Sequence, residues 1–327
     1  MQSSSKMVKI GNVTLSTPLI LAPMAGISSY PYRTINRKMG FELTYLEMIS
    51  ARSLCHLSRK TREKMLTGPD EAPLGIQLLA KDSQYILGGL ERLKDYKFDI
   101  LDLNAACPQK KITNNGKGAA LLKDPKKLNS LLKCLIKNTN KPITLKMRLG
   151  WDSSKDTLKI AKGAADAGVS AICVHGRTRE QGYRDGIDYK AIAKVKKALK
   201  IPIIGSGDIL NARLAKKMFD QTGVDAITVA RGALGNPWIF KEISEFLENG
   251  QLILRPKIQE VTQTMEQHLE LIISLFGEKV GVVRFRKFYI WYTKGFAKIK
   301  PLRTQISQIK TKIQMLKRIQ SLAKIAP

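Results

Sequence analysis

The segment "FDILDLNAACP" at residues 98–108 joins an apolar, strand-like run to a polar end that carries Asn104 and Cys107. Short apolar runs bounded by turn residues are typical of buried strands in a parallel sheet. The chain contains seven further runs of this kind: "LILAPMAG" (19–26), "LTYLEM" (43–48), "PLGIQLLA" (73–80), "PITLKMRLG" (142–150), "AICVHGRT" (171–178), "IPIIGSGDI" (201–209) and "AITVARGAL" (226–234). Helical patterns lie between them, at 28–39, 83–94, 124–137, 154–167, 188–199 and 211–221.

This alternation predicts eight parallel strands, closed into a (β/α)8 TIM barrel. An open, doubly wound sheet is the alternative. The polar residues favour the barrel, because they follow the apolar part of most runs and a barrel brings those strand ends together on one face. They include Gln77, Asn104, Cys107, Lys146, His175, Ser206 and Arg231, and Met24 takes the corresponding place in the first run.

The two ends of the chain depart from the alternation. Residues 7–15 predict a small hairpin that plugs the lower end of the barrel. The stretch "ENGQLILRPK" at 248–257 reads as a linker, and helical spacing returns at 258–275, 280–296 and 302–324, with Pro301 between the last two. We therefore expect a catalytic barrel at 1–247, a linker at 248–257 and a small basic helical domain at 258–327.

Positive charge dominates the composition. The 327 residues contain 56 Lys and Arg against 27 Asp and Glu, a net charge of +29. A lysine-rich genome would account for part of this excess. The excess of positive charge also favours a polyanionic partner. After Glu278 there is no acidic residue, while Lys279 to Pro327 include thirteen Lys or Arg.

Cations alternate with aromatic residues in "VVRFRKFYIWYTKGFAK" at 282–298. Cations that contact phosphates and rings that stack on bases are how proteins bind RNA. We expect Arg284, Arg286 and Lys287 to contact an RNA substrate. The aromatic side chains are expected to face the core of a helical domain instead.

The cysteines and the hydropathy argue against several protein classes. Cys55, Cys107, Cys134 and Cys173 form no CxxC pair, which argues for free thiols and against a metal site. No run reaches the roughly 18–20 apolar residues that span a bilayer. We expect a soluble, cytoplasmic monomer without a membrane segment or a metal.

Two strand ends predict a phosphate site. Ser206, Gly207 and Asp208 end the seventh run, and Ala230 and Arg231 end the eighth. The loops after these strands commonly bind phosphate in barrels, because small residues let backbone N–H groups approach an anion.

Three more strand residues carry groups that are costly to bury without a partner. Gln77 is either a satisfied core amide or a binder of a heterocyclic edge. Lys146 is either a Schiff-base lysine or a cation beside an electron-rich ring. His175, at a strand end, is expected to be functional.

The motifs together resemble one family. "LAPMAGIS", "LNAACPQKK", "GKGAALLKDP", "ITLKMRLGWD", "VHGRTREQGY", "IPIIGSGDI" and "ARGALGNPWIF" are similar to those of the tRNA-dihydrouridine synthases, most of all to the bacterial type B branch. The tail "RKFYIWYTKG" resembles the helical domain of that branch. The resemblance implies an FMN-bearing barrel that reduces a uridine of tRNA to 5,6-dihydrouridine, with NADPH reducing the flavin again.

The resemblance also implies roles for individual residues. The backbone of Pro23, Met24 and Ala25 would lie along the flavin ring. The polar edge of the ring would bind Gln77 and Lys146, and the phosphate would bind Ser206, Gly207, Asp208, Ala230 and Arg231. Cys107 would be the catalytic acid. Lys146 and His175 would be the other catalytic residues, with His175 in contact with the flavin or the uracil. Asn104 and Arg177 would lie near the substrate.

The chemistry suits a thiol acid. Hydride goes to uracil C6, and a thiol with a pKa near about 8.5 is still protonated at neutral pH and donates to C5. Because an acid needs its proton, we expect Lys110 and Lys111 to point away from the sulfur. The uracil must leave its stack to reach such a pocket.

The sequence departs from the family pattern at four positions: Ala106 and Ala230 replace glycine, Ser206 replaces asparagine, and Phe288 replaces histidine. Two other functions stay open. One is an FMN enzyme that acts on a free pyrimidine, similar to the dihydroorotate dehydrogenases. The other is a non-catalytic RNA-binding barrel.

Overall fold

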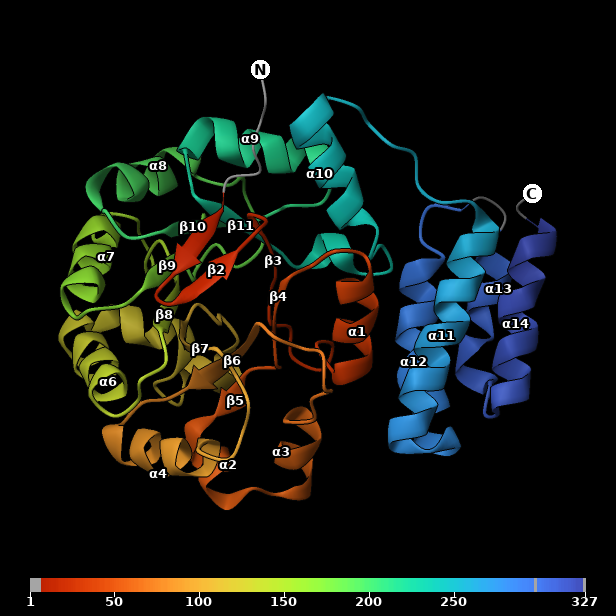
Figure 1. Ribbon diagram of the computed structural model, residues 1–327, viewed down its shortest axis with the longest axis horizontal. Coiled ribbons are helices and arrows are strands. Elements are labelled where there is room, and N and C mark those ends of the chain that lie inside the picture. The colour runs from red at the N-terminus through yellow and green to blue at the C-terminus, as the bar shows by residue number, and fades with distance from the viewer. Residues whose placement is uncertain (1–6, 297–298, 326–327) are drawn as a thin grey trace.

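A closed parallel barrel forms the larger part of the molecule (Figure 1). The computed structural model describes residues 7–296 and 299–325. Each barrel strand pairs in parallel with the next, and the β11–β3 and β4–β6 pairings complete the circle. The predicted TIM barrel is confirmed, and its strands are β3 (Leu19–Leu21), β4 (Leu43–Tyr45), β6 (Leu74–Leu79), β7 (Ile100–Ala105), β8 (Ile143–Arg148), β9 (Ala171–His175), β10 (Ile203–Ser206) and β11 (Ala226–Val229). A further short strand, β5 (Ile49–Ser50), pairs with β6.

Helices surround the barrel: α1 (Tyr30–Lys38), α2 (Ala51–His56), α3 (Arg59–Lys64), α4 (Ser83–Leu93), α5 (Lys110–Thr113), α6 (Pro125–Lys137), α7 (Thr157–Asp166), α8 (Tyr189–Ala198), α9 (Ala212–Thr222) and α10 (Ile239–Asn249). Two 3₁₀ helices, η1 (Gly118–Lys123) and η2 (Arg231–Ala233), follow β7 and β11. Side-chain caps lie at the first residues of two predicted helical stretches, 124–137 and 211–221. The Asp124 carboxylate accepts from the backbone N–H of Lys127, and Asn211 does the same for Leu214.

The predicted hairpin plugs the barrel. β1 (Val8–Ile10) and β2 (Val13–Leu15) pair antiparallel. Ile10 and Leu15 are fully buried, in one cluster with the first residues of β7, β9 and β11, namely Ile100, Ala171 and Ala226. The amino-terminal end of the barrel is therefore filled with apolar side chains, which leaves the opposite end for a site.

The C-terminal helices gather on one side of the barrel (Figure 1). They are α11 (Ile258–Phe276), α12 (Glu278–Tyr292), α13 (Lys300–Thr304) and α14 (Lys312–Ile325), with the 3₁₀ helix η3 (Ile306–Gln308) between the last two. We call these helices together the C-terminal bundle. Residues 250–257, which precede it, contain no helix or strand. α10 extends to Asn249, two residues into the stretch that the sequence suggests as a linker.

The third predicted helix of the bundle, 302–324, is wrong as one continuous element. α14 begins only at Lys312, because Thr311 starts a new helix with a capping box. The Thr311 hydroxyl accepts from the backbone N–H of Gln314 at 3.2 Å, and the Gln314 side chain accepts from the backbone N–H of Thr311 at 3.3 Å.

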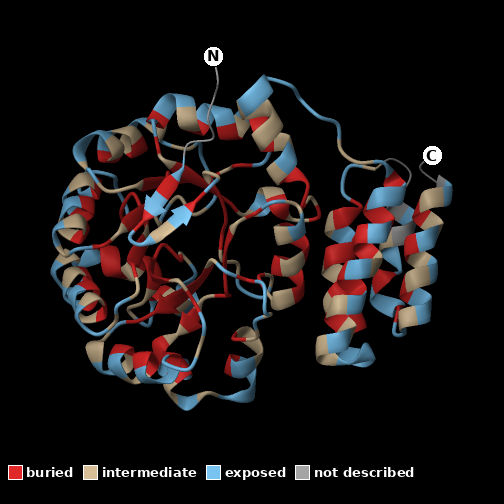
Figure 2. Cartoon of the chain, viewed as in Figure 1, coloured by how far each residue is buried: buried red, intermediate tan, exposed pale blue. Residues whose placement is uncertain are grey.

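Aromatic side chains join the bundle to the barrel. The ring of Tyr32 in α1 lies 5.8 Å from that of Phe288 and 6.3 Å from that of His268. Trp238 donates from its indole nitrogen to Glu260 at 2.7 Å. Figure 2 shows that buried residues continue from the barrel into α11 and α12.

The aromatic residues that the sequence assigns to a core are buried in α12, apart from half-buried Trp291: Phe285, Phe288, Tyr289 and Tyr292. That prediction is confirmed. Across the part of the chain that the structure describes, every helix is too short or too polar to cross a membrane.

We predict that His268 makes the fold sensitive to acid. Its side chain is completely buried among these rings, and burial lowers its pKa to about 3, with a contribution from Lys287. Since an unfolded histidine has a pKa near about 6.5, the unfolded state takes up the proton first as the pH falls. This group should therefore cost about 2 kcal/mol of unfolding free energy between pH 7 and pH 5. Urea denaturation of wild type and of His268→Phe at both pH values measures the effect. Equal losses in the two proteins would contradict it.

Candidate active site

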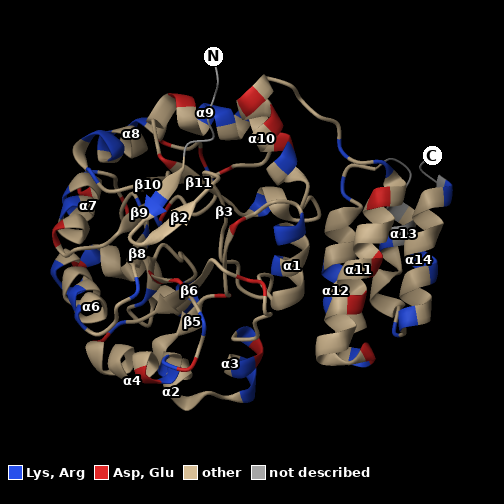
Figure 3. Ribbon diagram, viewed as in Figure 1, with Lys and Arg blue, Asp and Glu red and all other residues tan. Residues whose placement is uncertain are grey.

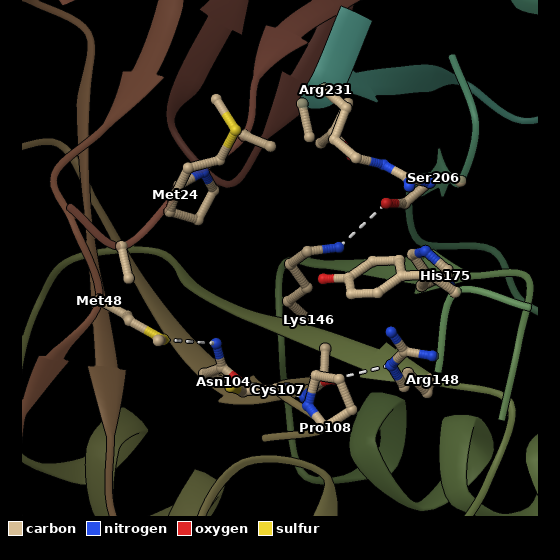
Figure 4. A pocket seen from close by; sticks show the side chains of 18 of the residues that line it. Met24, Met48, Asn104, Cys107, Pro108, Lys146, Arg148, His175, Ser206 and Arg231 are labelled. Carbon is tan, nitrogen blue, oxygen red and sulfur yellow. Dashed lines mark hydrogen bonds between the residues drawn. The ribbon is translucent and has the colours of Figure 1, made fainter. Parts of the chain in front are cut away.

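A cavity of about 300 Å³ opens at the carboxyl ends of the barrel strands (Figure 4). It collects most of the side chains that the sequence singles out. The residues of that set that line it are Pro23, Met24, Ala25, Gln77, Asn104, Cys107, Lys146, His175, Ser206, Gly207, Asp208, Ala230 and Arg231. Their convergence on one rim is what a closed parallel barrel requires.

The turn after β7 presents Cys107 to this cavity. The Asn104 side-chain oxygen accepts from the backbone N–H groups of Ala106 and Cys107, at 3.0 and 2.9 Å. Arg148 donates to the carbonyl of Ala106 at 2.8 Å from the other side. Ala119 donates to the Cys107 carbonyl at 3.0 Å. The backbone on both sides of the thiol is thus held by hydrogen bonds.

The Cys107 thiol has the properties of a proton donor. Burial raises its pKa, and the backbone N–H of Gln109 and the charge of Arg148 oppose this only in part. Lys110 and Lys111 are exposed to solvent, and the cation that acts on the sulfur is Arg148. Cys107 therefore keeps its proton at neutral pH.

Lys146 brings an ammonium group into the mouth of the barrel. Its Nζ donates to the Ser206 hydroxyl at 3.1 Å and lies 3.5 Å from the sulfur of Cys173 (Figure 4). Among the described residues, no carboxylate lies within ion-pair distance of this ammonium group. An anionic or electron-rich ligand in the cavity would meet this charge.

His175 at the end of β9 is a neutral imidazole. Burial lowers its pKa well below the usual value, and the nearby cations, Lys146 first among them, lower it further. Its Nδ1 is buried and has no hydrogen-bond partner within the described part of the chain. A ligand in the cavity would supply the missing partner.

Asp208 lies between two arginines in a cluster of net positive charge, which is a candidate anion site. Arg177 donates to it from two nitrogens, and Arg231 from a third. The hydrogen bond from Arg177 is the main cause that lowers the pKa of Asp208. One carboxylate against two guanidinium groups leaves one positive charge. The 3₁₀ helix η2 begins beside it at Arg231, and a short helix at this place is where barrels bind phosphate.

Comparisons with known proteins show the family of this chain. Residues 20–326 match the model of the dihydrouridine synthase (Dus) family. The chain belongs to this family. Dihydrouridine synthases are oxidoreductases, so the chain is an enzyme of that class.

Two relatives illustrate the similarity. The tRNA-dihydrouridine synthase B of Pseudomonas aeruginosa is 35% identical over 303 residues, which cover 92% of this chain and 91% of that protein. The probable tRNA-dihydrouridine synthase of Rickettsia conorii is 36% identical over 291 residues, 88% of each chain.

Solved structures share the fold at much lower identity. Histamine dehydrogenase from Rhizobium sp. 4-9 superposes with a TM-score of 0.57 at 13% identity, over 82% of this chain and 51% of that one. A 2-naphthoyl-CoA reductase gives 0.58 at 13% identity, over 74% and 52% of the two chains. These likenesses concern the barrel architecture alone.

Four of the expected substrate contacts of this dihydrouridine synthase lie outside the cavity. Arg177 is buried and is bound to Asp208 and to the carbonyl of Asp185. Arg286 donates to the carbonyl of Ile309 at 3.1 Å. The remaining two, Arg284 and Lys287, lie in α12.

Arg284 and Lys287 line a second cleft, between α3 and the C-terminal bundle. Arg284 pairs with Glu63 at 2.7 Å. The Lys287 ammonium donates to the carbonyl of Gly26. The backbone N–H of Gly26 donates to the Glu47 carboxylate at 2.6 Å. The loop that carries Met24 and Ala25 is thus held by one group of the barrel and one of the bundle.

Three residues that lie beside the predicted site residues are assigned no role by the sequence analysis. Asp102 and Arg148 are almost fully buried beside predicted residues, and Tyr183 packs over Arg231 at 4.7 Å on the rim of the cavity. Side chains two residues apart on a strand point to the same side, and this rule would have identified Asp102 and Arg148. Asp102 precedes Asn104 by two residues, and Arg148 follows Lys146 by two, so each pair shares one side of its strand. Tyr183 lies in a loop, where the sequence offers no such signal.

We predict that Cys107 reacts slowly with alkylating agents at neutral pH. Only the thiolate is nucleophilic, and the raised pKa keeps its fraction small. The rate of carbamidomethylation by iodoacetamide should rise about tenfold per pH unit up to at least pH 9. Peptide mapping by mass spectrometry distinguishes Cys107 from Cys55 and Cys134, and Cys107→Ser is the control. A rate that levels off below pH 8 would contradict the assignment.

Proposed function

We propose that this enzyme reduces a specific uridine of tRNA to 5,6-dihydrouridine, with FMN as its cofactor and NADPH as the electron donor. One observation carries the proposal. A protonated thiol, an ammonium group and a neutral imidazole line a single cavity at the barrel mouth, in a member of the dihydrouridine synthase family. Curated relatives of similar length are named tRNA-dihydrouridine synthase B.

The residues of the cavity fit a flavin mononucleotide. Among the described residues, the buried His175 Nδ1 has no hydrogen-bond partner, so a ligand can bond to it. The Lys146 ammonium, which donates to Ser206, has further N–H groups for a ligand. Gln77 uses one N–H on Asp102 and keeps the other. The anion site has a net positive charge, which suits a phosphate. Since the Asp208 carboxylate repels phosphate, we assign the contact to Arg231 and to backbone N–H groups of Ser206–Asp208 and Ala230.

The cofactor supplies the hydride for uracil C6 when it is bound. Hydride addition at C6 leaves an electron pair at C5, and a residue of the chain then supplies a proton to that carbon. The S–H bond of Cys107 breaks and a C5–H bond forms, which leaves a thiolate on Cys107. The guanidinium of Arg148 already acts on that sulfur and stabilises the thiolate until solvent returns a proton. We assign a contact with the uracil to Asn104, which shapes the same turn.

The RNA is held by charge outside the cavity. The target base must be flipped out of its stack to reach Cys107, so the rest of the tRNA stays on the surface. Exposed lysines of the bundle are suited to phosphate contacts, together with the cations of the second cleft (Figure 3). The lysines are Lys279, Lys294, Lys310, Lys317 and Lys324.

We predict that Cys107→Ala stops uridine reduction but keeps the flavin. Loss of a general acid lowers the rate about 10²- to 10⁴-fold. Dihydrouridine in tRNA, measured by mass spectrometry after reaction with purified protein and NADPH, should fall by that factor. The yellow absorbance of the variant should equal that of wild type. Cys134→Ala, in α6, is the matched control. Normal turnover in Cys107→Ala would remove the assigned role.

Substrate preference separates the three functions. NADPH oxidation that depends on tRNA supports the proposal. Oxidation driven by free uracil or orotate, with tRNA ignored, would show the enzyme of free pyrimidines instead. A colourless protein that binds tRNA, and in which Cys107→Ala has no effect, would show the non-catalytic barrel.

We also predict that the bundle lysines give tRNA binding its salt dependence. Each lost phosphate contact reduces the slope of log affinity against log salt by about 0.9 for duplex nucleic acid. Replacing Lys279, Lys294, Lys310 and Lys317 with Gln should weaken binding at low salt and flatten the slope by up to about 3.6.

Filter binding of tRNA from 50 to 300 mM salt measures this change. The same number of exposed lysines on α6, away from the bundle, provides the control: Lys126, Lys127, Lys133 and Lys137 to Gln. Equal effects of both quadruple variants would contradict a role for the bundle.

A further inference from the structure

Asp102 is a buried carboxylate that the proposed reaction does not use. It lies on β7, is 3% exposed and does not line the cavity. Its two oxygens accept from the Gln77 amide nitrogen at 2.8 Å and from the Thr144 hydroxyl at 2.6 Å. Burial raises its pKa to about 7, so the fold bears a cost for keeping this group inside. A carboxylate kept at such a cost needs an explanation.

A chain of hydrogen bonds leads from Asp102 to the thiol. The Gln77 side-chain oxygen accepts from the Asn104 amide nitrogen at 2.7 Å. The Asn104 oxygen then accepts from the backbone N–H groups of Ala106 and Cys107. Asp102, Gln77 and Asn104 are all at most 5% exposed, so water does not compete for these bonds.

The chemistry at the two ends of this chain imposes a direction. A primary amide has nearly the same shape in both flipped orientations, so its neighbours decide which way it points. The Asp102 oxygen that faces Gln77 accepts both in the carboxylate and in the acid that holds its proton on the other oxygen, beside the Thr144 hydroxyl. A backbone N–H only donates. Gln77 must therefore turn its NH₂ group to Asp102, and Asn104 must turn its oxygen to the Cys107 turn. A donor in place of Asp102 would favour the reverse orientation of both amides.

We propose that Asp102 is a positioning residue for uridine reduction, because it orients the Gln77 and Asn104 amides and, through Asn104, holds the backbone turn that presents the Cys107 thiol. The inference rests on the proposed function for its catalytic meaning. Asp102 neither lines the cavity nor touches the thiol, so its hydrogen bonds reach the turn through the two amides, while its charge also acts on Lys146. It leaves Gln77 one free N–H, and it keeps the thiol buried.

Paired variants of Asp102 test this role. Asn at this position can keep an acceptor toward Gln77 and turn its NH₂ to the Thr144 hydroxyl, which then accepts, so Asp102→Asn should stay within about threefold of wild type. Asp102→Ala removes the acceptor. The rate at which pre-reduced enzyme is reoxidised by tRNA, measured per bound FMN, should fall at least tenfold in Asp102→Ala, while flavin reduction by NADPH per bound FMN falls much less. FMN content itself is not the readout, because Gln77 also loses its orientation in this variant. A merely structural role would lower both rates together and would overturn the proposal.

Cys107 alkylation gives a second readout that needs neither tRNA nor turnover. In Asp102→Ala the turn relaxes and the thiol gains solvent, so iodoacetamide should label Cys107 several times faster at pH 8 than in wild type or Asp102→Asn. Unchanged labelling would overturn the proposal even if wild type proves to have another substrate. A wild-type enzyme that makes no dihydrouridine would refute the proposed function and leave this comparison valid.

Two further variants guard against misfolding. Thr44→Val changes another fully buried polar side chain of the barrel, whose hydroxyl makes no hydrogen bond to Asp102, Gln77 or Asn104. It should leave the reoxidation rate and the labelling rate of Cys107 unchanged. If Asp102→Ala fails to fold, Thr144→Val removes the other donor to the carboxylate at nearly constant shape. It should then raise Cys107 labelling by a smaller factor, and no change would count against the proposal.

Discussion

Closure of the sheet by the β11–β3 pairing is the constraint on which the site depends. A closed parallel sheet has no edge, so its strands leave the barrel at one common rim. The other end is filled by the hairpin of β1 and β2, with Ile10 and Leu15 inside it. Residues far apart in the sequence, such as Met24 and Arg231, thereby become walls of one cavity.

Arginines hold the walls of that cavity in place as much as they supply charge. The Arg148 guanidinium donates to the carbonyls of Ala106, Thr178 and Gly182, which belong to the loops after β7 and β9. Arg177 likewise connects the loop after β9 to Asp208 beyond β10. Such forked donors connect several backbone segments at once, which a lysine could not do in the same geometry.

The sequence alone predicts the barrel, the hairpin and most of the cavity residues, because strand ends and polar side chains follow simple periodic rules. It does not predict that Arg286 would bind the carbonyl of Ile309 or that Lys287 would bind that of Gly26. Those partners come from distant segments, and charge patterns carry no information about them. Thr311 and Gln314 have the spacing of a capping box, which would have predicted the break in the last helix. The helical spacing continues on both sides of it, so spacing alone misses the break.

The two anchors of Gly26 bear on how the enzyme can be divided. Glu47 holds the N–H of this residue from within the barrel, and Lys287 holds its carbonyl from the bundle. A barrel produced by itself would retain the full lining of the cavity, yet the peptide next to Met24 and Ala25 would be tethered at only one point. The two halves of the chain are therefore not interchangeable modules, and grafting this bundle onto another barrel would also require a matching glycine loop.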